Sequence, residues 1–417
     1  MNAFMNLSSQ KIFSLAAAML ISVLLARYLG PESYGIYVFV TAFIPLAAAP
    51  ITGGLPSLLT REVAKHHHND SRADFWATVT TTRRLIIGAS VIPLVLCVMG
   101  VFYFAPLSIG FMGSLCLLAV PFLMFEAANN GFIRGLHKPV LAEFSKKVVQ
   151  PLCLGGLLLA LVASNLLTVP TAVLCFIAAA ACSTLTSYFF YRKARPDPGR
   201  SEPTAIEQRA FLKTLLSISA VTLLIELNMQ LGVLILGALD QHVEAGAFRI
   251  AQRASQLAIL PVSIINLILA PQIAAAYQEG DSAELQRLAT RAGRSCFLVA
   301  LPSVPLFWFF GERLIEVIFG TGYISSTATA LFVLVTGQAI ALVFGSVWTL
   351  MMMTGHERRA MNGLMSAVTL QLILCVLLAP AHGALGAAVA TSISLILWRC
   401  IFAINVQKLI QINPSAI

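Results

Sequence analysis

Charged residues are scarce in this sequence: only 11% of its 417 residues are Asp, Glu, Lys or Arg, whereas soluble domains carry about 25%. A soluble protein needs polar side chains to cover its apolar core. Here 58% of the residues are hydrophobic. The shortage of charge therefore excludes a soluble globular protein and indicates one that crosses a membrane several times.

Motifs for chemistry are also missing. No G-x-x-x-x-G-K-[ST] loop occurs, which argues against ATP hydrolysis by this chain. The eight Cys lie in apolar segments without paired spacing, and His66 to His68 are expected in a short polar loop. We therefore expect no disulfide framework, no metal site and no cofactor. The connections on one side of the membrane are all short, which leaves no room for an outer catalytic domain and predicts a protein that is not an enzyme.

Apolar segments of about 20 residues are long enough to cross a bilayer as helices. The sequence contains twelve, which predicts an all-α integral membrane protein. They are 11–28, 36–57, 75–104, 108–131, 139–163, 168–190, 211–239, 247–275, 292–310, 327–354, 361–379 and 383–406.

The first two segments are separated by the polar part of ARYLGPESYGIYVF, from Ala26 to Phe39. Gly30 and Pro31 should end the first helix, because Gly permits a tight turn and Pro cannot continue a helix. The following Glu32 to Gly35 are then expected to turn the chain into the second helix.

Basic residues are distributed unevenly between the two sides of these spans. With twelve spans, both termini and the connections after even-numbered spans share one side, which holds 22 of the 27 Lys and Arg residues. The positive-inside rule places that side in the cytoplasm. The net charge of +9 is explained by this bias and by attraction to anionic membrane lipids, so nucleic acid is not an expected partner.

The two halves of the chain repeat each other at an offset of 211 residues. The identical pairs are Gly35 and Gly246, Pro50 and Pro261, Asp70 and Asp281, Ser71 and Ser282, and Arg83 and Arg294. Each repeat holds six spans, so both have the same orientation, as in parallel-repeat transporters. We predict an N-terminal six-helix lobe at 1–195, a cytoplasmic linker at 196–210 and a C-terminal six-helix lobe at 211–417.

Charged and amide side chains inside the spans are candidates for function, because an ionised group in a bilayer needs a partner or a wet cavity. Glu226 lies mid-span with Gln230 one turn later. On the next span, Arg249 and Arg253 are four residues apart on one helix face, and Gln252 and Gln256 accompany them. The alternative is structural: Arg249 would reach the membrane surface, and Glu226 would pair with an Arg.

A second polar cluster lies toward the cytoplasmic ends of spans four and five. Asn130 and Arg134 share a helix face and are candidates for a cytoplasmic mouth. Glu143 and Lys147 have the spacing of a helical ion pair, which is the simpler interpretation of those two.

The stretch ARYLGPESYGIYVF, followed by GGLPSLLTREVA (Gly53 to Ala64), resembles the first two spans of the polysaccharide transporter family. These are Wzx-type lipid-linked oligosaccharide flippases of the multidrug/oligosaccharidyl-lipid/polysaccharide exporter superfamily. The later FGTGY (Phe319 to Tyr323) resembles the segment before that family's tenth helix. The resemblance implies two pseudo-symmetric six-helix lobes around a central cavity, in the plasma (inner) membrane.

The implied function is alternating-access export of a lipid-linked oligosaccharide, with undecaprenyl pyrophosphate as the implied carrier, for surface polysaccharide such as O-antigen or exopolysaccharide. Membrane lipids and other polysaccharide-assembly proteins would be its partners. Two alternatives stay open. A multidrug exporter of the same superfamily would use Glu226 for cationic drugs, and a membrane-embedded glycosyl polymerase or ligase would need a large outer loop, which is missing.

Overall fold

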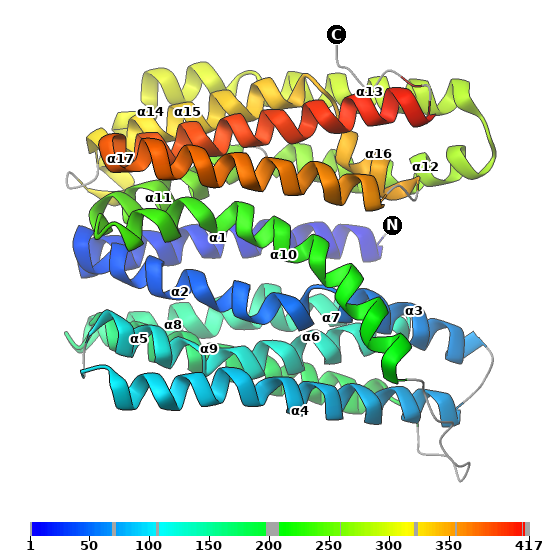
Figure 1. The fold of residues 1–417 in the computed structure, drawn as a ribbon, viewed down its shortest axis with the longest axis horizontal. Helices are drawn as coiled ribbons and strands as arrows, with labels where there is room; N and C mark the ends of the chain where they lie inside the picture. Colours follow the sequence, from blue (N-terminus) through cyan, green and yellow to red (C-terminus); the bar gives the residue numbers. More distant parts are fainter. Residues whose placement is uncertain are drawn as a thin grey trace. The chain divides into compact units, whose positions relative to one another are not determined.

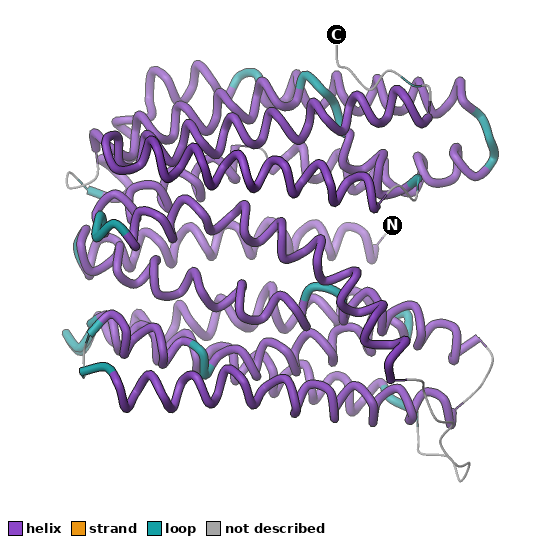
Figure 2. The backbone as a smooth tube through the Cα atoms, in the orientation of Figure 1, coloured by secondary structure: helices purple, strands orange, loops and turns teal. Residues whose placement is uncertain are grey.

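The computed structural model describes residues 2–68, 72–105, 108–196, 208–258, 260–320, 324–354, 357–410 and 412. Within these ranges the backbone forms helices and loops without a strand (Figure 2). The predicted all-α membrane class is therefore confirmed.

The first half of the chain forms a series of helices interrupted by one π-helical segment, η1. These elements are α1 (Asn2–Leu29), α2 (Pro31–Thr52), α3 (Leu55–His68), α4 (Arg72–Tyr103), α5 (Ile109–Cys116), α6 (Ala119–Gly135), α7 (Pro139–Phe144), η1 (Ser145–Val149), α8 (Gln150–Ala163) and α9 (Val169–Ala194).

The second half repeats this order with different helix breaks. Its elements are α10 (Gln208–Ala238), α11 (His242–Ala258), α12 (Leu260–Gln278), α13 (Ser282–Ala300), α14 (Ser303–Phe319), α15 (Ile324–Leu342), α16 (Val347–Met353) and α17 (Glu357–Ile410). The repeat places α2 and α11 in register, because Pro31 and His242 are also 211 residues apart.

Nine helices of the described residues are long and apolar enough to cross a membrane. One of them, Arg359–Leu409, contains the last two predicted spans, which meet at the non-helical residue Gly383 (φ 52°, ψ −131°). The predicted eighth span is divided into α11 and α12, and the tenth contains the shorter apolar helix Ser326–Leu342. The nine long helices are therefore consistent with about twelve spans.

The turn between α1 and α2 is shorter than predicted. Gly30 alone adopts a left-handed conformation (φ 79°), and α2 begins at Pro31. The expected turn through Glu32 to Gly35 is wrong, because these residues form the first turn of α2. Proline at the first helical position is favourable, and an acidic residue in the first turn interacts well with the helix dipole.

A glycine pair separates α2 from α3. The freed backbone groups at this break are satisfied by α10: Gly54 N donates to Ser219 Oγ at 3.0 Å, and Thr222 Oγ1 donates to the Gly53 carbonyl at 3.3 Å. Such substitute hydrogen bonds allow a helix to be interrupted at membrane depth.

The helix α3 extends further than the sequence indicated. It continues through His66, His67 and His68, so the expected loop at these residues is wrong. After Pro56 in the first turn, no Gly or Pro occurs before Asn69. Buried Leu59 and Val63 on the same helix pack closely against Gly131 and Gly135 of α6, which stabilises α3 along its length.

The chain forms two compact units. Unit 1 comprises Met1–Leu29 and Phe39–Glu226, and unit 2 comprises Gly30–Val38 and Leu227–Ile417. One of the three boundaries therefore lies at the turn between α1 and α2, and the other two fall within helices α2 and α10. The predicted linker lies mostly outside the described residues, at 197–207, so the domain limits at 195 and 211 stay predictions.

In unit 1, α6 packs against α3 and α9, and Figure 1 shows these helices running alongside each other. In unit 2, α15 packs against α11 and α17. Glu244 of α11 lies beside the break in α17. Its carboxylate accepts hydrogen bonds from Ala384 N, just after the break, and from Ser326 Oγ of α15, both at 2.8 Å. The second part of α17 therefore begins with a capped backbone N–H.

Gly35 and Gly246, which are equivalent in the repeat, lie at a close crossing of α2 and α11 inside unit 2. A Cβ built on Gly246 would lie 3.4 Å from the Gly35 Cα and 3.1 Å from the Tyr34 ring, whereas one built on Gly35 would overlap the backbone carbonyl of His242. Glycine is required here for space rather than for backbone conformation.

Candidate functional site

Arg249 of α11 is held between two amide side chains of unit 2. Its Nη1 donates to Gln252 Oε1 at 2.8 Å, and its Nη2 donates to Gln230 Oε1 on α10. Gln252 donates in turn to the backbone carbonyl of Met229 at 2.9 Å. Both glutamines are buried. Three of the predicted site residues are thus brought together, and they fix the position of one guanidinium group.

Arg253 and Gln256 continue the same face of α11 one turn later. Both are half-buried, and within the described residues neither side chain forms a hydrogen bond or an ion pair. Arg stays charged under all physiological conditions. Arg253 therefore presents a positive charge that no described carboxylate neutralises, which suits an anionic ligand.

Glu226 lies on α10, one turn before Gln230, and is also half-buried. It is the last residue of unit 1, whereas both arginines belong to unit 2. No ion pair joins Glu226 to an Arg among the described residues, so the structural role considered for it has no observed partner.

A buried polar network surrounds Asn228 in unit 2, and it was not predicted from the sequence. Asn228 Nδ2 donates to Gln371 Oε1 at 2.6 Å and to Ser394 Oγ at 3.1 Å, and Gln371 Nε2 donates to Asn228 O at 3.0 Å and to Thr391 Oγ1 at 3.1 Å. Gln371 and Ser394 are fully buried. Polar residues inside the apolar runs TLQLIL and TSISLIL were the only signal for this network.

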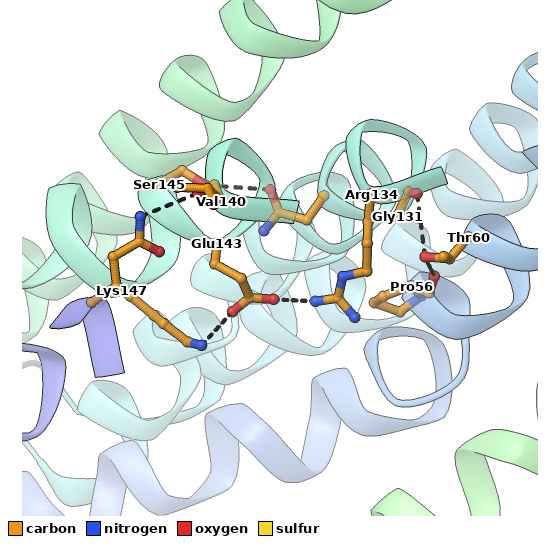
Figure 3. Close-up of polar contacts among 10 residues, drawn as sticks. Pro56, Thr60, Gly131, Arg134, Val140, Glu143, Ser145 and Lys147 are labelled. Carbon is orange, nitrogen blue, oxygen red and sulfur yellow. Dashed lines mark hydrogen bonds and ion pairs between the residues drawn. The ribbon is translucent and has the colours of Figure 1, made fainter. Parts of the chain in front are cut away.

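The other two candidates, Asn130 and Arg134, lie on α6 in unit 1. Figure 3 shows the carboxylate of Glu143 between the side chains of Arg134 and Lys147. The Lys147 Nζ to Glu143 Oε2 distance is 2.9 Å, so the predicted helical ion pair is confirmed. Asn130 is buried and accepts a hydrogen bond from Ser145 Oγ at 3.3 Å. The structure thus engages both candidates in contacts within unit 1.

Metal-ligating side chains do not gather in the described part of the chain: it has no group of three or more His, Cys, Asp or Glu residues that would hold an ion. The chemistry offered by the site is therefore that of Arg and amide side chains on α10 and α11, which donate hydrogen bonds to phosphate and sugar oxygens.

Residues 2–276 match the model of a family described as polysaccharide biosynthesis protein. The chain belongs to this family. The matched region contains the motif from Ala26 to Phe39 as well as Glu226, Gln230 and the polar face of α11, so the resemblance predicted from the sequence is confirmed. No curated protein sequence matches the chain significantly.

Solved structures share the fold of this family member at low sequence identity. An inward-facing multidrug resistance transporter of the MATE family and MOP superfamily matches with a TM-score of 0.75 at 14% identity, covering 98% of each chain. The lipid II flippase MurJ, in an inward closed conformation, matches with a TM-score of 0.74 at 14% identity, covering 96% of this chain and 87% of MurJ.

A MOP-superfamily transporter from Pyrococcus furiosus, whose binding pocket is described as having reverse polarity, matches with a TM-score of 0.69 at 15% identity, covering 98% of this chain and 95% of its own. The chain thus has the fold of MOP-superfamily transporters. This fold is shared by structures described as drug transporters and as a lipid flippase, so the substrate must be argued from the side chains.

Proposed function

We propose that this protein is a flippase that moves a lipid-linked oligosaccharide from the cytoplasmic to the outer leaflet by alternating access. The substrate class is a sugar chain joined through pyrophosphate to a polyprenyl lipid, which combines a double negative charge, many hydroxyls and an apolar tail. Membership of the polysaccharide biosynthesis family supports this substrate class, and the shared fold of a lipid II flippase supports the reaction.

The observation that carries the proposal is the unneutralised Arg253 on a face that also holds Arg249, Gln252 and Gln256. The planar guanidinium group binds phosphate through two parallel hydrogen bonds, and amides suit sugar hydroxyls. Because Arg249 is already held by Gln230 and Gln252, Arg253 is assigned to the phosphate. Gln256 is assigned to the sugar.

The proposed direction requires both termini and the linker at 196–210 to be cytoplasmic, in agreement with the concentration of basic residues on that side. An alkaline phosphatase fusion at Asp197 should therefore be inactive, because this enzyme becomes active only after export. A fusion at Ala105, in the short connection between α4 and α5, should be active and serves as the control. Strong activity at Asp197 would reverse the orientation and with it the proposed direction.

Deleting the gene should cause a lipid-linked oligosaccharide to accumulate at the inner leaflet and should remove the corresponding polysaccharide from the cell surface. The lipid extract of the mutant, analysed by mass spectrometry, would identify the accumulated intermediate and its carrier. Complementation with the intact gene provides the control. Normal surface polysaccharide together with increased sensitivity to cationic dyes in the deletion strain would contradict the proposal.

A drug exporter is the second candidate, because Glu226 is a half-buried acid without an ion-pair partner among the described residues. Cationic drugs bind such carboxylates. This candidate is favoured if dye efflux, rather than surface polysaccharide, is lost in the deletion strain.

A further inference from the structure

Six polar side chains are buried together in unit 1, at a point where α6, η1 and α9 pack against each other. They are Glu126, Asn129 and Asn130 of α6, Ser145 of η1, and Ser183 and Ser187 of α9. Glu126 is only 1% exposed, and the three serines are fully buried. Burial of an acid in a membrane span is costly and marks functional positions.

Hydroxyl and amide groups surround the acid. Ser183 Oγ donates to Glu126 Oε1, and Asn129 Nδ2 donates to Ser187 Oγ at 3.1 Å. The Ser145 hydroxyl donates to Asn130 Oδ1 at 3.3 Å, a contact that Figure 3 draws from the labelled Ser145. Glu126 thus has two hydroxyl neighbours, Ser183 and Ser145. Each can reverse its hydrogen bond to the acid, because a hydroxyl both donates and accepts.

The backbone at Ser145 is also unusual. Ser145–Val149 form a π-helical segment between α7 and α8. Single π-turns inside helices are rare and occur often at functional sites. This provides a second observation, independent of the buried acid, at the same place.

Charged groups around Glu126 do not neutralise it directly. Lys146 on η1 and Glu143 on α7 act on it electrostatically, but Lys146 is exposed and Glu143 is already paired with Arg134 and Lys147. Within the described residues, Glu126 has no ion pair.

The other helices packed on α6 direct their charges and titratable groups elsewhere. On α9, Tyr191 lies two turns beyond Ser183, and the Arg83 guanidinium of α4 lies over its ring at 5.8 Å. On α3, Arg61 pairs with its neighbour Glu62 at 3.5 Å. The Thr60 hydroxyl of the same helix donates to the carbonyl oxygens of Pro56 and Gly131 (Figure 3). Glu126 is therefore an acid stabilised by neutral donors.

We propose that Glu126 binds and releases a proton during the transport cycle, and so couples export to the proton gradient. This inference rests on the proposed transport function. The carboxylate takes a proton from a hydronium ion, which leaves water, and the resulting carboxylic acid donates a hydrogen bond to Ser183 Oγ. On release, the proton returns to water and Ser183 again donates to the carboxylate. No other bond is formed or broken.

A sodium ion suits this cluster less well than a proton. Glu126 is the one carboxylate of this cluster, and the described residues hold no group of three or more His, Cys, Asp or Glu side chains. A metal ion would need several oxygens converging on one position. A proton needs only the acid and one partner that accepts a hydrogen bond.

Infrared difference spectroscopy on the purified protein in liposomes tests the proposal without any transport substrate. The wild type should show the C=O stretch of a protonated carboxylic acid at low pH, and this band should disappear as the pH rises. Because the other carboxyl groups of the chain also protonate at low pH, the Glu126 component is the difference between the wild type and Glu126→Gln. Glu226→Gln and Glu143→Gln should retain this component. Ser183→Ala should move the transition upward by about one pH unit, because the carboxylate loses a hydrogen-bond donor.

Several outcomes would overturn the proposal. One is a pH-dependent band that is identical in Glu126→Gln and the wild type. Another is the absence of such a band from the wild type. A third is a band that responds to sodium at constant pH and not to pH itself. Size-exclusion elution at the wild-type volume confirms that each variant is folded.

A flipping assay tests the proton coupling separately from the proposed flippase function. In liposomes loaded with lipid-linked oligosaccharide, an imposed proton gradient should accelerate flipping by the wild type and not by Glu126→Gln. Titration of Glu126 without any flipping by the wild type would refute the proposed function alone. Flipping by the wild type that ignores the gradient would refute the coupling alone.

Discussion

Replacing Arg253 with Glu should abolish export of the surface polysaccharide, while the protein still inserts into the membrane at a normal level. Arg253 has no described ion-pair partner, so the change removes a free positive charge and puts a negative one where the pyrophosphate should bind. Arg253→Lys should be partly active, because the charge remains and the bidentate geometry is lost. Complementation of the deletion strain, with surface polysaccharide as the readout, measures both.

A matched variant is Arg313→Glu, which makes the same charge change at a side chain that is 80% exposed on α14. It should support normal export. The drug-exporter candidate predicts the opposite ranking, in which Glu226→Gln abolishes dye efflux and Arg253→Glu has little effect. Full surface polysaccharide from Arg253→Glu would eliminate the anion site.

Gly35→Leu should prevent folding. A Cβ at Gly35 overlaps the backbone carbonyl of His242, and backbone cannot move aside as a side-chain end can. Overpacking in well-packed regions usually costs about 1–3 kcal/mol, and a clash with buried backbone should exceed this range. We expect almost no monodisperse protein after solubilisation, measured by fluorescence-detected size-exclusion chromatography.

Substitutions at two other glycines serve as controls for Gly35→Leu. Gly246→Ala should be milder, because its nearest contact is the Tyr34 ring at 3.1 Å, and Gly88→Ala should be neutral, because a Cβ there meets nothing within 4 Å. Equal yields of Gly35→Leu and Gly88→Ala would show that the helix crossing tolerates a side chain.

Composition and apolar length were sufficient to predict the membrane class, because a bilayer selects strongly for both. Helix ends were predicted less well, since opposing local signals act at the same residues. Glu32 to Gly35 have turn-forming types, but Pro31 before them starts a helix. His66 to His68 are polar and suggest a loop. However, Leu59 and Val63 pack on α6, which is distant in the sequence, and this packing stabilises a longer α3.

In the candidate site, too, contacts within one helix were predictable from the sequence, whereas contacts between helices were not. Helical spacing correctly brought Arg249 and Gln252 to one face, because residues three apart are neighbours on a helix. Spacing did not show that Gln230 would complete the contact from α10. The serines around Glu126 were missed because Ser183 is 57 residues away and its hydroxyl resembles those of other helix-embedded serines.

The meeting of Gly35 with Gly246 has a consequence for the symmetry of the chain. A position that touches its own copy is what a two-fold axis produces in a homodimer, where one patch must be complementary to itself. The contact is therefore the one that two copies of a six-span half would make about a two-fold axis. Both of its positions are Gly, whereas nearby positions differ between the halves: Arg249 and Arg253 of one correspond to Val38 and Ala42 of the other.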